Sequence, residues 1–243
     1  MKVAYVDMVG GAAGDMLMGA WVDAGVDVAQ LERALRSVVA EGWELVTERV
    51  DRAGVSALHL DLIIPGEDDH AHGQGARHHH AHEGHRLSDI LAIVARSGLS
   101  LRQIERASSI YRRLADAEAR VDGTTANDVI FHAVGQIDAI LDVAGTCIAL
   151  DLLDIGDLRC SAFPRGRDPD RASLELLREF PIRAVDVDAN LVTATGAAIL
   201  TTLATPAAAA PRMVIERTGY GAGRRNFPIP NVVCVTIGEA VHS

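Results

Sequence analysis

The sequence predicts an α/β fold with a mixed sheet, flanking helices and a long His-rich loop. Short apolar runs of strand character alternate along the chain with segments of helical apolar period, as in α/β proteins. About half of the 243 residues are hydrophobic (49%) and few are aromatic (4%), so the chain can bury one sizeable aliphatic core. Seven of the ten histidines fall in one Gly-containing run between positions 70 and 85.

The N-terminal part predicts a strand and two helices. A short buried strand is expected at 3–7, because VAYVD is apolar up to its last residue. A glycine turn follows, and Asp15 opens an amphipathic helix that Gly25 stops. Asp27 is expected to cap the next helix, since aspartate is a preferred N-cap residue.

Two paired strands and the His-rich loop come next. Apolar residues alternate along 43–50 and 55–64, which indicates two strands that pair with each other. Pro65 ends the second strand, and the segment 66–86 is expected to be a flexible metal-binding loop.

The remainder of the chain alternates helices and strands, which supports the α/β prediction. The segment 101–121 shows a clear helical period, with charged residues opposite its apolar face. The other helices are expected at 88–96, 136–153 and 196–203, and short strands at 158–162, 182–185, 213–217 and 232–237. This pattern leaves the strand order open.

Charge and cysteine content narrow the classes of partner. The net charge of −10 argues against nucleic acid as a partner, because phosphates require a basic surface, and it suits a metal cation. No secretory signal or membrane-spanning stretch is recognisable, so a membrane partner is not expected. Cys147, Cys160 and Cys234 are widely spaced in apolar contexts and indicate buried thiols in a reducing compartment. A cytoplasmic location is therefore expected.

The His-rich run predicts metal handling. Neutral imidazole is the commonest protein ligand for borderline metals, and several in a Gly-containing segment can surround one ion. This ligand set favours nickel, zinc or copper over magnesium or calcium, which prefer oxygen. A merely polar, solvated loop is the alternative. The expected metal ligands are His70, His72, His78, His79, His80, His82 and His85.

A Gly-rich turn joins the first strand to the first helix and could bind an anion. Its backbone N–H groups, at Gly10, Gly11 and Gly14, could approach a phosphate at the helix N-terminus. The spacing matches neither a P-loop nor a dinucleotide fingerprint. A plain connection with Asp15 as N-cap is the more frequent explanation of such a turn. Asp7 stands at the carboxyl end of the strand, where α/β folds gather ligands.

His132, Asp138 and Asp142 form a second candidate site in FHAVGQIDAILD. The two aspartates are four residues apart on one face of a helix whose other residues are apolar. Two acids on a largely buried helix need a partner, which can be a metal, an arginine or backbone donors. A working site and an ordinary salt bridge to an arginine elsewhere are both open.

Two further Gly-containing motifs could hold anions. Thr193, Thr195 and Gly196 stand at the start of a helix, where Thr193 is a natural N-cap and free N–H groups could bind an anion. The segment 219–225 (GYGAGRR) carries two guanidinium groups that could grip a phosphate or carboxylate. A tight hairpin turn explains its glycines equally well.

Taken together, these motifs resemble the LarC nickel-insertion family over nearly the whole chain. The combination is specific, although no motif is specific alone. The matching pieces, in family order, are VDMVGGAAGDMLMGA, the His-rich insertion after two strands, RRLADAEARVDG, FHAVGQIDAILDVAG, VTATGAAIL and TGYGAGRRNFPIPNV.

The resemblance implies nickel insertion into pyridinium-3,5-bisthiocarboxylic acid mononucleotide, through one carbon–nickel and two sulfur–nickel bonds. The product would be the nickel-pincer cofactor of lactate racemase-like enzymes, and the reaction would be a lyase-type chelation that depends on CTP with Mg²⁺ or Mn²⁺. The His-rich loop would concentrate nickel, and the glycine turns would meet the precursor's phosphate. Asp7, Asp15, His132, Asp138 and Asp142 match polar positions of the family motifs, so the resemblance makes them metal- or proton-handling groups.

The sequence also departs from the family pattern. Ala133 replaces the glutamate that usually follows the histidine, Ile130 replaces a histidine, and the segment after Ser161 is shorter. By this resemblance, the chain is expected to be one N-terminal region, 1–243, without the family's C-terminal nucleotide-binding domain, where the CTP site would lie. A separate C-terminal half and a lactate racemase-like apoenzyme are therefore expected protein partners. A His-rich nickel or zinc storage protein and a nucleotide-binding enzyme unrelated to nickel are the alternatives.

Overall fold

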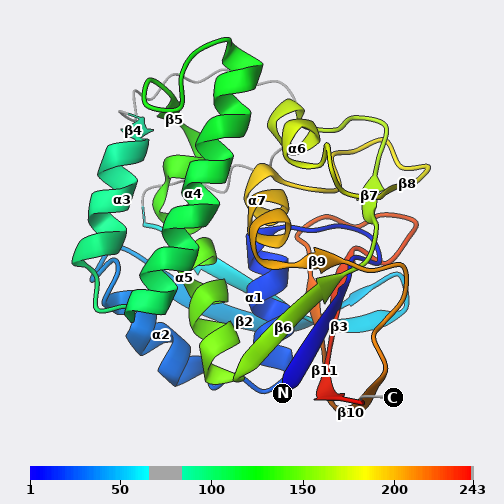
Figure 1. Ribbon diagram of the computed structural model, residues 1–243. Coiled ribbons are helices and arrows are strands. Elements are labelled where there is room, and N and C mark those ends of the chain that lie inside the picture. The colour runs from blue at the N-terminus through cyan, green and yellow to red at the C-terminus, as the bar shows by residue number, and fades with distance from the viewer. Residues whose placement is uncertain (66–83, 242–243) are drawn as a thin grey trace.

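The computed structural model describes residues 1–65 and 84–241. Seven strands form one mixed sheet in the order β2-β3-β10-β11-β1-β6-β9 (Figure 1). They are β1 (Lys2–Asp7), β2 (Glu44–Arg52), β3 (Val55–Ile63), β6 (Ile155–Cys160), β9 (Thr205–Pro206), β10 (Met213–Ala222) and β11 (Val232–Ala240). The α/β class and the mixed sheet are confirmed, whereas most of the predicted His-rich loop lies outside the described residues.

The central strand β1 explains why the sheet is mixed. It pairs antiparallel with β11 and parallel with β6. β2 and β3 form the expected antiparallel pair, and β3 joins the sheet through a single parallel bridge between Leu58 and Gly221. Two smaller ladders pair β4 (His85–Arg86) with β5 (Ile130–Phe131), and β7 (Phe163–Arg165) with β8 (Ile182–Ala184).

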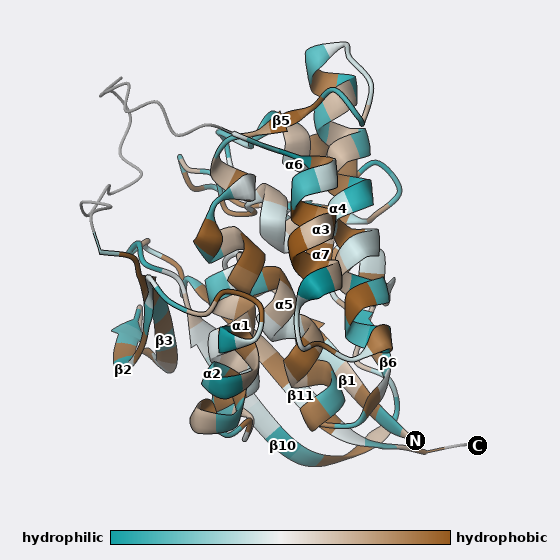
Figure 2. Ribbon diagram, turned by 90° about the vertical axis from the view of Figure 1, so that its left-hand side faces the viewer, coloured by the Kyte–Doolittle hydropathy of each residue, from teal (hydrophilic) through white to brown (hydrophobic). Residues whose placement is uncertain are grey.

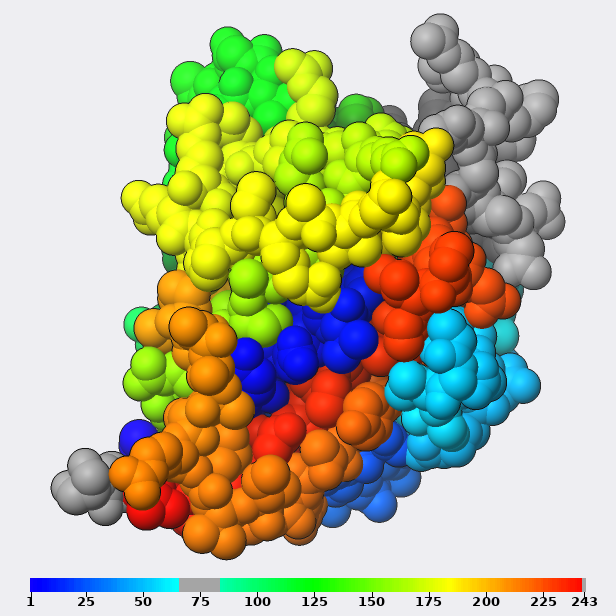
Figure 3. All heavy atoms as spheres, turned by 90° about the vertical axis from the view of Figure 1, so that its right-hand side faces the viewer, coloured from blue at the N-terminus to red at the C-terminus, as the bar shows by residue number. Residues whose placement is uncertain are grey.

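The helices lie on one side of the sheet and enclose the main core (Figure 2). They are α1 (Gly14–Asp23), α2 (Val28–Arg36), α3 (Leu87–Arg96), α4 (Leu101–Asp122), α5 (Ile137–Leu152), α6 (Arg171–Leu176) and α7 (Ala194–Leu203). α1 packs on β10 and β3 and also contacts α5, while α4 covers α5 and α7. The opposite face of the sheet is hollowed beneath the segment that follows β7 (Figure 3).

Close packing of α1 on β10 requires glycines in the strand. A Cβ at Gly221 would lie 1.8 Å from the carbonyl oxygen of Met16, and one at Gly219 would lie 2.3 Å from that of Ala20. These two glycines therefore stand inside β10, and only the end of the segment 219–225, after Ala222, lies in the connection between the antiparallel strands β10 and β11. The strand is longer than expected because glycine lets the helix backbone approach it.

The remaining predictions of local structure hold with small shifts of boundary. Asp27 caps α2 by accepting a hydrogen bond from the Gln30 N–H. All three cysteines are free, Cys147 and Cys160 are buried, and Cys234 is half-buried. Burial raises the pKa of Cys147 to about 12. Within the described ranges, no helix combines the length and the apolarity needed to cross a membrane.

Candidate functional site

The candidate site lies where the N-terminus of α1 meets α5. Gly14, the first residue of α1, packs directly against Asp142: a Cβ at this position would lie 2.3 Å from the Asp142 Oδ2. Asp138 stands one turn earlier on α5, and its Oδ1 accepts a hydrogen bond from the Ala139 N–H at 2.8 Å. The predicted acidic face of this buried helix therefore points at the start of α1.

Asp15 brings a third carboxylate to this place. The prediction that it caps α1 is wrong, because Ala13 is the N-cap residue and Asp15 lies in the first turn. Its Oδ1 accepts a hydrogen bond from the Met16 N–H at 2.8 Å. Its Oδ2 lies 3.9 Å from the Nε of Arg224. A carboxylate in a first helical turn also interacts favourably with the helix dipole.

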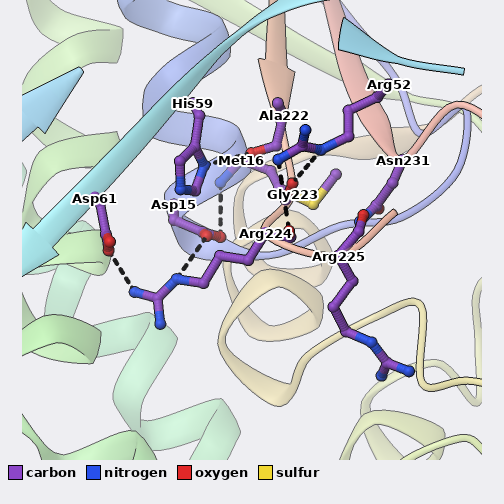
Figure 4. Close-up of polar contacts among 10 residues, drawn as sticks. All are labelled: Asp15, Met16, Arg52, His59, Asp61, Ala222, Gly223, Arg224, Arg225 and Asn231. Atoms are coloured by element: carbon purple, nitrogen blue, oxygen red, sulfur yellow. Dashed lines mark hydrogen bonds and ion pairs between the residues drawn. The ribbon is translucent and has the colours of Figure 1, made fainter. Parts of the chain in front are cut away.

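Arg224 connects this group to the β2–β3 hairpin (Figure 4). Its Nη2 donates a hydrogen bond to Asp61 on β3 at 2.5 Å, while its Nε faces Asp15. Arg52 fixes the backbone beside it by donating to the Gly223 carbonyl oxygen at 2.8 Å. Arg224 of this segment therefore binds carboxylates, as predicted, but these carboxylates are side chains of the protein itself.

His59 and Tyr111 complete the site. The Nδ1 of His59 lies 3.2 Å from the Ala222 carbonyl oxygen, and the ring lies above Asp15 in Figure 4. Tyr111 of α4 is fully buried, and its hydroxyl donates to the Val134 carbonyl oxygen at 3.4 Å. Burial raises the pKa of Tyr111 well above its usual value, and the nearby charges of Asp142 and Asp138 add to this shift.

The electrostatics favour the protonated form of Asp142, beside Asp15. Burial raises the pKa of Asp142 well above its usual range, and repulsion from Asp15 and Asp138 raises it further. Burial also raises the pKa of Asp15, although Arg224 opposes this shift. One of two neighbouring carboxyl groups then holds a proton at a pH where an exposed carboxyl group would have lost it. Such a pair can give or accept a proton above the pH range in which an exposed carboxyl group titrates.

Asp7 lies apart from this group. It is the last residue of β1, and its neighbour Val6 belongs to the main core beneath the helices. Successive side chains of a strand point to opposite faces, so Asp7 points to the other face of the sheet. There it stands in register with Cys234 on β11, and its charge raises the pKa of that thiol together with burial.

His132 lies beside Gly84, one residue before His85. It follows β5, and a Cβ at Gly84 would lie 3.2 Å from its Nδ1. His85 begins β4 and pairs with Phe131. The other predicted metal ligands lie outside the described residues: His70, His72, His78, His79, His80 and His82. Within 1–65 and 84–241, no group of three or more His, Cys, Asp or Glu residues is arranged to hold a metal ion.

Packing accounts for the glycines of the predicted anion-binding turn. A Cβ at Gly10 would lie 2.0 Å from the Pro230 carbonyl oxygen, and one at Gly11 would lie 2.8 Å from that of Leu191. The Gly10 N–H donates to the Val232 carbonyl oxygen at 3.2 Å. Gly196 packs on the carbonyl group of Ala12 in the same way. The turn is therefore held tightly between two segments of the protein.

Thr193 and Thr195 stand where the first turn of α7 was expected. Thr193 is the N-cap, as predicted, and its Oγ1 accepts a hydrogen bond from the Gly196 N–H at 3.1 Å. Thr195 is buried in the first turn. This capping hydrogen bond is enough to account for a threonine at position 193, without any ligand.

Sequence reasoning missed His59, Asp61 and Tyr111. His59 and Asp61 lie in an ordinary alternating strand, and Tyr111 lies in the apolar stripe of α4, so no local pattern distinguishes them. The one available signal was the charge of Asp61 next to buried Leu60 and Leu62. A half-buried charge such as that of Asp61 needs a partner, and this partner, Arg224, lies more than 160 positions further along the chain.

Comparison with known proteins agrees with the motifs. A family model described as "Nickel insertion protein" matches residues 4–243. Two relatives are named "Pyridinium-3,5-bisthiocarboxylic acid mononucleotide nickel insertion protein". That of Desulfitobacterium hafniense is 38% identical over 98% of this chain and 59% of its own length. That of Geobacillus kaustophilus is 36% identical over 98% of this chain and 60% of its own length.

The chain thus spans about three-fifths of the length of the curated relatives that it matches. No solved structure matches it. The family model covers all but the first three residues, and the relatives align along almost the whole chain. The chain belongs to the nickel insertion protein family.

Proposed function

We propose that the chain takes part in the insertion of nickel into pyridinium-3,5-bisthiocarboxylic acid mononucleotide, which yields a nickel-pincer cofactor. Family membership and the names of the relatives support this substrate. The single observation that carries the proposal to particular residues is the carboxyl pair of Asp15 and Asp142 at the N-terminus of α1. Such a pair suits a reaction in which a ring proton must be removed.

The chemistry requires proton handling as well as metal delivery. Formation of a carbon–nickel bond replaces a hydrogen on the pyridinium ring, so a base must take up the proton. The raised pKa values of Asp15 and Asp142 make these carboxyl groups stronger bases than exposed ones, which suits this task. Arg224 offsets part of the negative charge that gathers there. We propose that these groups, with Asp138, form the working site.

Nickel is the substrate metal, and we propose that the His-rich run supplies it. Imidazole nitrogens bind Ni²⁺ in preference to Mg²⁺ or Ca²⁺. The run ends at His85, whose strand β4 pairs with the strand that precedes His132. We propose that His132 and His85 stand on the route from the run to the carboxylates. Asp7 belongs to the opposite face of the sheet, so we give it no part in this route.

The described residues do not fit a nucleotide triphosphate. The Gly10 and Ala12 N–H groups donate to carbonyl oxygens of Val232 and Leu191, so they cannot cradle phosphates. No triad of metal ligands in the described ranges is placed to hold Mg²⁺ or Mn²⁺. We therefore derive no step through CTP from this chain. We propose that any CTP site, and the lyase-type activity of the whole protein, needs a region equivalent to the rest of the relatives' length.

The proposal is tested by mass spectrometry of the precursor after incubation with the full chain, Ni²⁺, CTP and Mg²⁺ under reducing conditions. One arm contains the chain alone, and the second adds the remaining region of the Desulfitobacterium hafniense relative. We expect nickelated product in at least the second arm. We expect Asp142→Asn to lower its yield by about 100-fold, the lower end of the range for general acid–base catalysis.

Asp157→Asn is the matched control, because Asp157 forms a surface pair with Arg159 on β6 and lies outside the site. It should keep the parent's yield. Absence of product in both arms, with nickel still bound to the chain, would instead favour a nickel or zinc storage protein. Equal yields from Asp142→Asn and the parent would remove the carboxyl pair from the mechanism while leaving the family reaction intact.

A further inference from the structure

His59 is held by one ring nitrogen in a defined protonation state. Its Nδ1 lies 3.2 Å from the Ala222 carbonyl oxygen. A carbonyl oxygen can only accept a hydrogen bond, so the Nδ1 carries the proton. A neutral imidazole has one N–H group, and the Nε2 therefore keeps its lone pair. Among residues 1–65 and 84–241, no hydrogen-bond or ion-pair partner contacts this second nitrogen.

The ring stands beside the carboxylate group. Figure 4 shows His59 above Asp15, with Asp61 to the left and the guanidinium of Arg224 below them. Its positive form would favour the charged form of Asp15, which shows that the two groups are close enough to interact. His59 is half-buried in β3, the strand that runs toward the His-rich segment.

We propose that His59 is the base that accepts the ring proton when the carbon–nickel bond forms; this rests on the proposed function. The ring C–H bond breaks, and its electron pair forms the bond to Ni²⁺. The proton moves to the lone pair of the His59 Nε2 and gives an imidazolium ion. No oxidant or reductant is needed, because carbon, nickel and nitrogen exchange only a proton and an electron pair.

The charges around His59 suit this role. Asp15 on α1 and Asp61 on β3 lie near the ring in Figure 4, and the charges of Asp15 and Asp138 act in turn on Asp142 of α5. Glu48 of β2 stands opposite His59 in the hairpin. The guanidinium of Arg224 opposes the imidazolium ion but is itself paired with Asp61.

His59 is a better first acceptor than Asp15. The Asp15 Oδ1 already accepts the Met16 N–H, and its Oδ2 faces Arg224. An imidazole with a free lone pair is a stronger base than such a carboxylate and works near neutral pH. The carboxyl pair of Asp15 and Asp142 can then take the proton onward.

The test compares the parent with His59→Asn in the nickel-insertion assay. The asparagine amide can still donate to the Ala222 carbonyl oxygen, but it has no basic nitrogen. We expect product formation to fall by about 100-fold or more. Ser56→Asn places the same side chain at an exposed position of β3 and should match the parent.

A second measurement does not depend on activity. Nitrogen-15 NMR of the nickel-free protein identifies the protonated nitrogen of each histidine, and His59→Asn assigns the His59 signals. The Nδ1–H tautomer is expected for His59, and a dominant Nε2–H tautomer would overturn the inference. An active parent with an equally active His59→Asn variant would also overturn it and leave the proposed function standing. An inactive parent in both arms of the insertion assay would remove the proposed function, and the inference with it.

Discussion

At the scale of single residues, Asp142 is a carboxyl group whose charged form the fold disfavours. The pKa of this carboxyl group lies well above its usual range, because it is buried and faces Asp15 and Asp138. The native state therefore binds a proton that the unfolded chain has released. Stability must then fall as pH rises from the ordinary carboxyl range to the raised pKa of the folded state. The site is maintained at a cost in stability.

Asp142→Asn should therefore stabilise the protein at neutral pH. The amide cannot ionise, so the free energy of unfolding at pH 7.5 should exceed the parent's. At pH 4 the two proteins should differ little. Urea unfolding at both pH values measures this, with Asp157→Asn as the surface control. Identical pH slopes for Asp142→Asn and the parent would show that Asp142 is ionised at little cost.

At the scale of elements, the packing of α1 on β10 fixes the position of Asp15. Gly221→Ala would place a Cβ 1.8 Å from the carbonyl oxygen of Met16, so helix and strand must separate. We expect a loss of about 3 kcal/mol or more in unfolding free energy, as for severe overpacking. In Gly156→Ala on β6 the new Cβ meets only the flexible side chain of Met1, and a change within about 1 kcal/mol is expected. Similar losses for both variants would contradict this account.

Variants of Thr193, the cap of α7, can distinguish a structural role of its hydroxyl group from a role in ligand binding. Thr193→Ala removes the hydrogen bond to the Gly196 N–H, which should cost about 1 kcal/mol of stability. Thr193→Ser should retain it, since serine caps equally well. Thermal unfolding of the three proteins checks this. A loss of precursor binding by Thr193→Ala at unchanged stability would instead assign the hydroxyl to the ligand.

The elements also show what the sequence could predict. Helical period and strand alternation located α4, α5 and the β2–β3 pair, because these signals are local. The glycines of β10 were misread, since their cause is α1, about 200 positions away. The acidic face of α5 was visible as the spacing of Asp138 and Asp142. Its approach to Gly14 depends on tertiary packing, which no local pattern encodes.

At the scale of the whole molecule, the site joins segments from both ends of the chain. Asp15 comes from the first helix, Asp61 from the hairpin, Asp142 from α5, and Arg224 from the segment after β10. Arg224 links its own segment to the first helix through Asp15 and to the hairpin through Asp61. Asp7 matched the family motif as well as Asp15 did, but strand alternation turned it to the other face. The motif therefore gave the candidate residues, and the fold separates Asp7 from the candidate carboxylates on α1 and α5.

The His-rich run should be separable from this framework. Replacing His70, His72, His78, His79, His80 and His82 with serine keeps the length of the segment and leaves β4 intact from His85 onward. Bound nickel per chain, measured by calorimetry and metal analysis, should fall sharply, because imidazole is the main ligand there. The melting temperature without metal should not change, because the substitutions leave the described core and sheet as they are.

The same six-serine variant distinguishes delivery from storage. If the run feeds nickel to the carboxylate site, product formation should slow at limiting nickel and recover at saturating nickel, because the site itself is intact. Equal rates for variant and parent at limiting nickel would show that the run has no part in delivery. If the variant bound as much nickel per chain as the parent, other residues would be binding the metal. The assignment of the nickel ligands to the run would then be wrong.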